Sequence, residues 1–284
     1  MANMVRKSVY AGTWYPGGNK ELRTFIRQAM DQSEAPTIEA RRIQALIVPH
    51  AGYVYSGKAA AAAYRLLKGR DIRRVFLLGP SHRAFLPGIA TGHYQAYLSP
   101  MGRIPLDRDT MEQLIAGSPH FLRDPGAQAQ EHSLEIQLPF LQYFLTDFTL
   151  TPLLVGNLDG ADIPHVAAEL EKHIDDHTLL VASSDFTHYG PGFGYTPFES
   201  NIRQKVQELD MGAVALIEKK DTAGFLRYVE QTGATICGYL PIAIVLAVMA
   251  KQPVAVSLLD YYTSGQITGD YANSVSYAAL AIHQ

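Results

Sequence analysis

Histidines follow three apolar, strand-like runs in this sequence, each close to the point where the run ends. They are His50 after residues 43–48, His82 after residues 75–78, and His188 after residues 179–182. In an open α/β sheet, ligands collect outside the carboxyl ends of the strands, so we expect the three imidazoles to share one site. Imidazole is the commonest metal-ligating side chain and suits zinc, iron and copper alike. The spacing therefore predicts a metal or acid–base site.

The third metal ligand stays open on these residues alone. Two imidazoles and one carboxylate on one face of Fe(II) leave positions free for substrate and dioxygen, and Asp185 or Glu131 would supply that carboxylate. Cys237, the single cysteine of the chain, is the other candidate. It begins an apolar run that we predict to be helical, and a helix N-terminus lowers a thiol pKa and favours the thiolate. The alternative is that Cys237 is a small buried hydrophobe.

Two carboxylates stand beside histidines in the sequence. Asp185 precedes His188 by three residues, and Glu131 directly precedes His132. A carboxylate near an imidazole orients the ring and raises its basicity, which suits proton transfer near neutral pH. The alternative for Asp185 is a structural turn or cap, and for Glu131 a charge favoured by a helix N-terminus.

Composition excludes several classes of protein. The 284 residues carry 24 Lys and Arg against 27 Asp and Glu, a net charge of −3, and 47% are hydrophobic. Neither an intrinsically disordered chain nor a nucleic-acid-binding surface fits this balance. One cysteine excludes an intramolecular disulfide, and with no apolar leader at the start we expect a reducing, cytoplasmic setting. The apolar run 236–250 is too short for a membrane span and contains Pro241, so we predict a buried core helix.

Strand-like and helix-like periodicities alternate along the chain. This order predicts an α/β fold: one domain over residues 1–284, with a layered parallel or mixed sheet flanked by helices. The predicted strands are residues 43–48, 75–78, 89–91, 95–98, 148–155, 179–182, 254–262 and 273–282. The predicted helices are residues 17–30, 58–67, 107–115, 133–145 with a bend at Pro139, 163–174, 200–217, 222–230 and 236–250.

Seven segments, in order from residue 11 to 278, resemble the Memo family, whose prokaryotic members are called AmmeMemoRadiSam system protein B. The segments are AGTWYP (11–16), PHAGYVYSG (49–57), LGPSH (78–82), EHSLE (131–135), SSDFTH (183–188), TICG (235–238) and NSVSYA (273–278). This family is similar in fold to the class III extradiol (LigB-type) dioxygenases, non-haem Fe(II) enzymes that open catechol rings. The resemblance therefore implies a class III extradiol dioxygenase-like fold for the whole chain.

The resemblance also implies roles for individual residues. His50 and His82 match the two metal histidines, and His188 matches the acid–base histidine, which we group with Asp185. Where the dioxygenases have a glutamate ligand, the Memo pattern has a cysteine, which is Cys237 here. We expect one iron or copper ion per chain, with zinc as a further candidate, because a thiolate is softer than a carboxylate. The remaining pocket residues that we predict are Glu131, His132, Tyr55 and Ser81.

Two readings of function follow from these residues. The first is a metal-dependent redox or oxygenase-like enzyme. The second is a non-enzymatic module whose former dioxygenase pocket binds a peptide or partner protein, since vertebrate relatives are associated with phosphotyrosine peptides. An anionic ligand would need a cation near the histidines, and Arg83 follows His82 directly. The resemblance further implies radical-SAM and AMMECR-type partner proteins, with neither nucleic acid nor membrane as a partner.

Overall fold

The computed structural model describes residues 4–284, in which helices and strands alternate as the apolar runs predict. The strands are β1 (Val5–Arg6), β2 (Ile43–Val48), β3 (Arg74–Pro80), β4 (Ile89–Thr91), β5 (Ala96–Ser99), β6 (Gly102–Pro105), β7 (Phe121–Arg123), β8 (Thr149–Val155), β9 (Thr178–Ser183), β10 (His188–Tyr189), β11 (Ala255–Thr263) and β12 (Ser274–His283). The helices are α1 (Asn19–Asp31), α2 (Tyr53–Tyr64), α3 (Arg108–Gly117), α4 (Pro125–Ala129), α5 (His132–Glu135), α6 (Leu138–Phe144), α7 (Ile163–Glu171), α8 (Ile202–Glu218), α9 (Thr222–Thr232), α10 (Tyr239–Met249) and α11 (Ser264–Thr268), with short 3₁₀ turns η1 (Arg65–Leu67) and η2 (Pro191–Phe193).

A nine-stranded mixed sheet forms the centre of the α/β fold. Its strand order is β10-β12-β2-β9-β3-β8-β4-β7, and β11 pairs with β12 outside that path. The strands β2, β9, β3 and β8 run parallel to one another, whereas β12 and β4 lie antiparallel to their neighbours in that block. The carboxyl ends of the four parallel strands therefore meet at one edge of the sheet, as the sequence predicted for the histidines.

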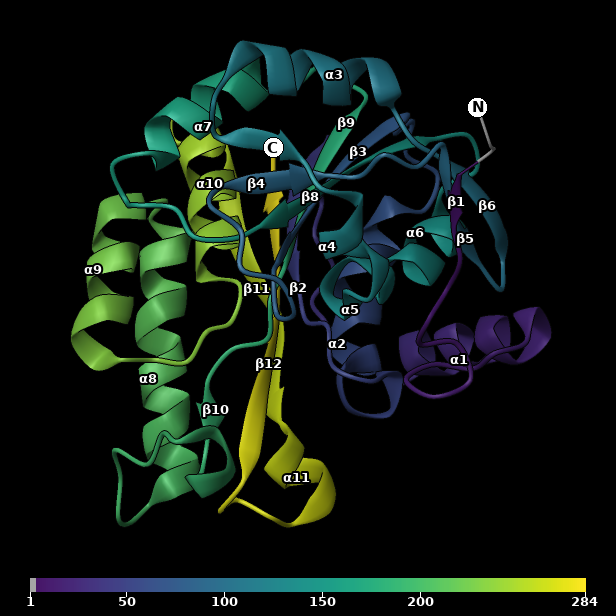
Figure 1. The fold of residues 1–284 in the computed structure, drawn as a ribbon. Helices are drawn as coiled ribbons and strands as arrows, with labels where there is room; N and C mark the ends of the chain where they lie inside the picture. Colours follow the sequence, from purple (N-terminus) through teal and green to yellow (C-terminus); the bar gives the residue numbers. More distant parts are fainter. Residues whose placement is uncertain (1–3) are drawn as a thin grey trace.

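Helices cover both faces of this sheet. Along β2, Leu46 and Val48 belong to the hydrophobic core under α1, α2 and α6, while Ala45 and Ile47 belong to the core under α7 to α10. Successive side chains of a strand point to opposite faces, so a strand buried on both faces must be a continuous apolar run. Figure 1 shows α8, α9 and α10 on one side of the sheet and α1 and α2 on the other.

The apolar run 236–250 becomes α10, which packs on α7 and on strands β9 and β3 as the predicted core helix. Nearly all of its side chains are buried in the core. In the described residues 4–284, none of the helices has the length and apolar character that a membrane crossing requires.

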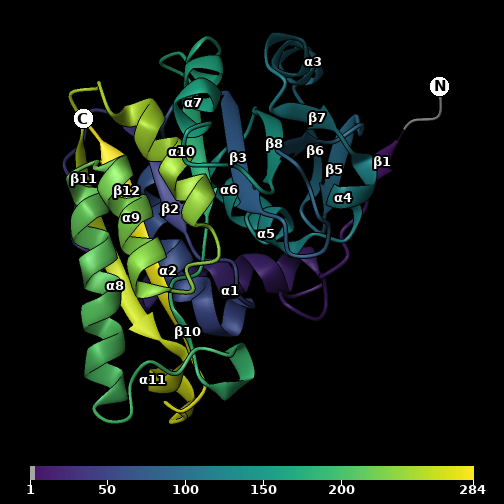
Figure 2. The ribbon, with the colours of Figure 1, turned by 60° about the vertical axis from the view of Figure 1, so that its left-hand side comes forward.

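The structure adds elements that periodicity did not predict. A small second sheet with the order β1-β5-β6 lies at the opposite end of the molecule from α8 and α9 (Figure 2). The single helix predicted over residues 133–145 is two helices, α5 and α6, and Pro139 stands in the first turn of α6. A proline lacks the N–H that an uninterrupted helix would need there, which explains the break. The break leaves α5 free to place His132 beside the sheet edge.

Candidate functional site

Three histidines converge at the carboxyl edge of the sheet. His50 follows β2, His82 follows β3, and His132 opens α5. One ring nitrogen from each lies within 4.8 Å of the others. The ring centroids are 5.2 Å apart for His50 and His82, and 4.4 Å apart for His82 and His132. His132, which we predicted only as a pocket residue, is thus as close to the two strand-end histidines as they are to each other.

Glu131 lies behind two of these rings and is fully buried. Its Oε1 lies 3.0 Å from Nδ1 of His82 and 3.2 Å from Nδ1 of His132. It also accepts hydrogen bonds from the backbone N–H groups of His82, His132 and Ser133, so it caps α5 and fixes the rings at once. Burial acts to raise the pKa of Glu131, but the hydrogen bonds and charge of His82 outweigh it and lower the pKa to about 2. Because the carboxylate accepts from Nδ1–H of His82, Nε2 of that ring is left free for a metal.

His50 has its tautomer set by a chain of hydrogen bonds. The Ser183 hydroxyl donates to the Ser133 carbonyl (2.6 Å), so its oxygen accepts from Nδ1–H of His50 (3.0 Å) and from the Gln137 amide (2.8 Å). Nε2 of His50 is therefore the unprotonated nitrogen, and its lone pair is available to a metal ion. Burial, assisted by the nearby His82, lowers the pKa of His50 well below its usual range. The ring is therefore neutral, which is the form that binds metals.

Cys237 lies directly against that lone pair. Its Sγ is 3.1 Å from Nε2 of His50 and 3.5 Å from the Asp185 carbonyl oxygen. The expectation that a helix terminus lowers the pKa of Cys237 is wrong, because the pKa is raised. Cys237 precedes α10 by two residues, and burial, together with the Asp185 charge, raises the pKa of the thiol. Desolvation disfavours the charged form of the thiol.

Asp185 and His188 bond to different partners. Oδ1 of Asp185 accepts from the backbone N–H groups of His50 (2.7 Å) and Ala51 (3.3 Å), so the carboxylate holds the loop that carries His50. Burial raises the pKa of Asp185, and the charge of His188 opposes that shift. Nδ1 of His188 lies 3.0 Å from the Phe186 carbonyl and 3.1 Å from the Thr235 carbonyl, which leaves its Nε2 free. Asp185 therefore has a structural role in the His50 loop, which was the alternative for this residue, and it also lies at the site.

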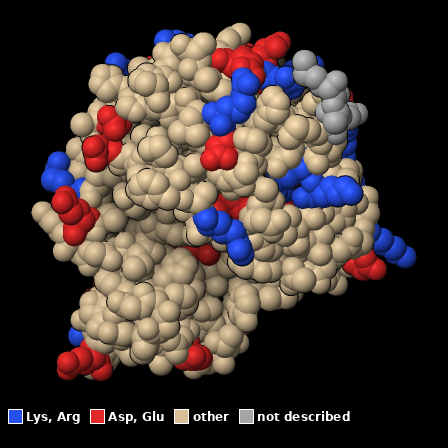
Figure 3. All heavy atoms as spheres, in the orientation of Figure 1, with Lys and Arg blue, Asp and Glu red and all other residues tan. Residues whose placement is uncertain are grey.

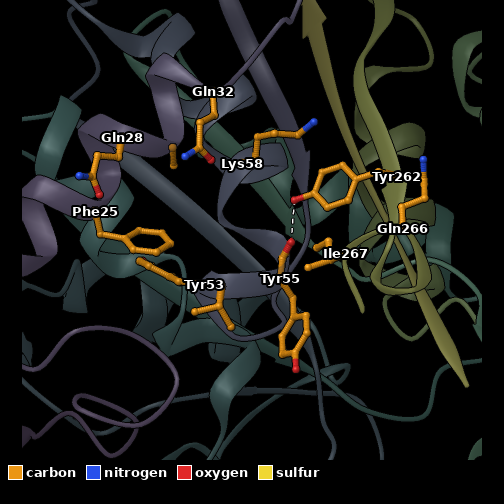
Figure 4. Close-up of a pocket in the computed structure, with 11 residues that line it drawn as sticks. Phe25, Gln28, Gln32, Tyr53, Tyr55, Lys58, Tyr262, Gln266 and Ile267 are labelled. Carbon is orange, nitrogen blue, oxygen red and sulfur yellow. Dashed lines mark hydrogen bonds between the residues drawn. The ribbon is translucent and has the colours of Figure 1, made fainter. Parts of the chain in front are cut away.

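The two other predicted pocket residues lie at the margins. The Ser81 hydroxyl donates to the Ala84 carbonyl (2.7 Å), which shapes the turn behind His82. Tyr55, in the first turn of α2, lines a separate cavity of about 520 Å³ between α1, α2 and α11. Figure 4 shows its ring pointing away from Lys58, while its carbonyl oxygen accepts from the Tyr262 hydroxyl (2.7 Å). Their roles in binding stay predictions.

Sequence reasoning missed the tryptophan that covers the site. The Trp14 ring centroid lies 4.6 Å from that of His132. The segment that carries Trp14 is held by buried Glu135, which accepts from the Tyr10 N–H (2.8 Å) and the Tyr15 hydroxyl (2.8 Å). Trp14 lies within one of the family-like segments, which is the signal that could have identified it. On the face seen in Figure 1, the surface is hollowed between α5 and β10, with acidic atoms in its depth (Figure 3).

Comparison with known proteins agrees with the resemblance seen in the sequence. A solved structure, an uncharacterized protein of Escherichia coli K12, has a similar fold, with a TM-score of 0.56 at 15% identity over 84% of this chain and 99% of that one. A MEMO1 family protein of Thermoplasma volcanium is 33% identical over 98% of both chains. The memo-1 homolog of Caenorhabditis elegans is 33% identical over 98% of this chain and 83% of that protein, and MEMO1 of Rattus norvegicus is 31% identical over 99% of both. The family model described as Memo-like protein matches residues 6–281. This chain therefore belongs to the Memo family.

Proposed function

We propose that this protein binds one iron or copper ion through His50, His82 and Cys237 and uses it in redox or oxygenase-like chemistry. The observation that supports the proposal most is the convergence of His50, His82 and His132, with the Cys237 Sγ 3.1 Å from Nε2 of His50. Hydrogen bonds on Nδ1 orient the rings of His50 and His82. His132 offers the same ion a further imidazole. A group of imidazoles with oriented rings is a preformed ligand set.

The donor types fit a late transition metal. Imidazole nitrogens suit copper, zinc and iron, and a thiolate selects soft ions such as Cu(I) and Zn²⁺. The raised pKa of the Cys237 thiol weakens metal binding at neutral pH but does not prevent it, because a bound metal ion displaces the thiol proton. Metal uptake at this site releases a proton and strengthens with rising pH. Among the candidate ions, the Irving–Williams order places copper above iron and zinc.

We assign proton transfer to His188 and positioning of a metal ligand to Asp185. A bound iron or copper ion would supply one-electron and Lewis-acid chemistry. His188 presents a free Nε2 because its Nδ1–H is held by two carbonyls, so it can accept or donate a proton at that atom. Asp185 holds the His50 loop through two backbone N–H groups and keeps that ligand in place.

The test measures metal content and metal affinity together. Elemental analysis of purified protein gives the ion and its stoichiometry. Quenching of Trp14 fluorescence reports copper titration, because Trp14 is the sole tryptophan and its ring contacts that of His132. We expect His50→Ala and His82→Ala to lose the bound ion. His177→Ala is the matched control, because His177 precedes β9 at its amino end, roughly 20 Å from Ser183 at the observed strand length.

Two further variants distinguish the donor sets. Cys237→Ser should remove the thiolate-to-copper charge-transfer absorption, whereas His132→Gln should leave that band and weaken binding less. Equal metal content in the parent, His50→Ala and His82→Ala would refute the proposal. Loss of metal in His132→Gln with full retention in Cys237→Ser would instead assign the site to the three histidines.

Exposed Arg83 beside His82 favours a second candidate, a module that binds phosphotyrosine peptides. Calorimetry with a phosphotyrosine peptide and its unphosphorylated twin tests it. Binding that needs the phosphate and is lost in Arg83→Ala would support this candidate. The buried carboxylates of Glu131 and Asp185 near the rings disfavour a dianion.

A further inference from the structure

A second cavity, of about 530 Å³, opens at the carboxyl ends of β3 and β8. Two loops form it, residues 81–88 after β3 and residues 156–162 after β8. Backbone hydrogen bonds join the loops, from Gly156 N–H to the Gly88 carbonyl (2.8 Å) and from Asn157 N–H to the Leu86 carbonyl (2.8 Å). The two loops that supply most of the lining are therefore joined through their backbones, and His120 and Tyr239 complete the lining.

This cavity adjoins the histidine site along the chain. Phe85, in its lining, is three residues after His82, and Tyr239, also in its lining, is two residues after Cys237. At 3.8 Å per residue, the Cα atoms of these pairs are at most about 11 Å and about 8 Å apart. Parts of the cavity lining therefore lie within the length of an ordinary metabolite from the segments that carry His82 and Cys237.

Two exposed aromatic rings stand at the cavity. Phe85 is 83% exposed, the highest value for a large apolar side chain in the described residues, and Tyr239 is 36% exposed. Both rings are therefore open to a ligand that enters the cavity. Neither ring belongs to the two hydrophobic cores.

Two carboxylates lie in the same lining without a compensating cation. Within residues 4–284, no Lys or Arg nitrogen lies within 4.0 Å of Asp159 or Asp162, and the nearest basic atom given for Asp162 is Nε2 of His120 at 3.9 Å. Asp162 does not cap α7 with its side chain. It accepts instead from the Asp159 N–H (3.3 Å), which holds both residues at the cavity.

We propose that this cavity binds an organic cation, a substituted ammonium group, between the rings of Phe85 and Tyr239 and the carboxylates of Asp159 and Asp162. Aromatic faces attract ammonium groups through their quadrupole, and carboxylates add a charge-assisted contact. Anions are repelled by the two carboxylates. A bare Ca²⁺ or Mg²⁺ ion prefers six or more oxygen ligands without aromatic rings. That the cation is one end of the molecule on which the histidine site acts rests on the proposed function.

The probe for this cavity is choline, compared with 3,3-dimethylbutan-1-ol, in which a tert-butyl group replaces the trimethylammonium group at nearly the same shape. Binding of each to the full-length protein is measured by calorimetry and by saturation-transfer NMR, with and without copper. We expect choline to bind at least about fivefold more tightly than the neutral analogue, which corresponds to the ~1 kcal/mol of one cation–π contact.

Variants locate the binding. Asp159→Asn and Asp162→Asn should each weaken choline binding about fivefold, and Phe85→Leu should do so while keeping an apolar side chain. Asp147→Asn is the control, because it makes the same change in net charge on an exposed loop before β8. Equal binding of the two probes, absence of choline binding, or an equal loss in Asp147→Asn would overturn the proposal.

The same variants separate this inference from the proposed function. Phe85, Asp159 and Asp162 are not among the proposed metal ligands, so their substitution should leave metal content unchanged. A protein that binds choline but no metal would refute the metal site and support the cation site. The reverse result would refute the cation site alone.

Discussion

The two ends of the parallel strands differ in how they handle charge. At the carboxyl ends, the carboxylates of Glu131 and Asp185 are buried, and backbone N–H groups donate to both. At the amino ends, Arg74 pairs with Asp175 at 2.6 Å, but their side chains are 30% and 50% exposed. A buried charge is costly unless it is paired or hydrogen-bonded, whereas an exposed pair is largely solvated. The two edges therefore differ in burial: the carboxylates at the carboxyl edge are buried, and the ion pair at the amino edge is partly exposed.

The largest expected effect is at Glu131. Glu131→Ala leaves three buried or partly buried backbone donors and the His82 imidazole without their acceptor, so we expect a loss of at least about 3 kcal/mol in the free energy of unfolding. Metal affinity should fall by about 10- to 100-fold. Urea unfolding and copper titration measure the two effects, with exposed Glu39→Ala as control. A change below about 1 kcal/mol with unaltered affinity would remove the contrast between the two edges.

Gly238 tests how closely the carboxyl edge is packed. A Cβ at this position would lie 2.5 Å from the Ser183 carbonyl oxygen and 2.5 Å from Cβ of Ser184. We expect Gly238→Ala to cost about 1–3 kcal/mol and to displace neighbouring Cys237. Gly160→Ala is the control, because its Cβ would meet only Cδ1 of Leu226 at 3.6 Å. Equal melting temperatures for the two variants would show that the backbone at this edge shifts to accommodate the added methyl group.

Asp210, buried on α8, should make the free energy of unfolding depend on pH. Burial raises the pKa of Asp210, against hydrogen bonds from Ser276, Thr187 and Tyr261 that lower it. Because the folded-state pKa is raised, the protonated form stabilises the fold below the unfolded pKa of about 3.9, and this contribution is lost as pH rises through the folded pKa. Relative to Asp210→Asn, the parent should lose stability over that window, with a slope of at most about 1.4 kcal/mol per pH unit.

Measuring both proteins by urea unfolding at a series of pH values isolates Asp210, since all other titrating groups are common to them. The Asn side chain can still accept from Thr187 through its carbonyl oxygen. A difference that does not vary with pH would show that Asp210 titrates alike in the folded and unfolded chains.

The smallest effect is expected at the amino edge. Arg74→Ala removes an exposed ion pair, so we expect a loss below about 1 kcal/mol that shrinks further at high salt. A loss above about 2 kcal/mol would show that both edges depend on ordered charges.

The long apolar elements were predictable because an apolar run of that length must be buried, whichever elements cover it. The predicted strand 43–48 agrees with β2 at both ends, and the core helix at 236–250 contains α10. Helix α2 begins at Tyr53 rather than at Lys58, because Tyr53 and Gly57 pack tightly against neighbours such as Phe25 that local propensity does not register. The two-residue strands β1 and β10 have no period to detect, since they exist only through pairing with β5 and β12.

The candidate site was likewise predictable only in part. His50 and His82 were predictable from their places after apolar strands, and the family-like segments indicated Glu131, His132 and Cys237. That His132 joins the other two histidines was not predictable, because the position of α5 over β3 depends on the break before Pro139. The state of Cys237 was predicted wrongly because desolvation depends on the surrounding atoms rather than on the adjacent helix.

By itself, the sequence determined the chemical types, namely which residues carry imidazole, thiol and carboxylate groups and which strands end beside them. The tertiary structure alone decided which nitrogen of each ring is free. The partner of His50 is Ser183, 133 positions away, and the partner of His82 is Glu131, 49 positions away. A tautomer is set by the hydrogen bond on the opposite nitrogen, and only folding brings those donors and acceptors together.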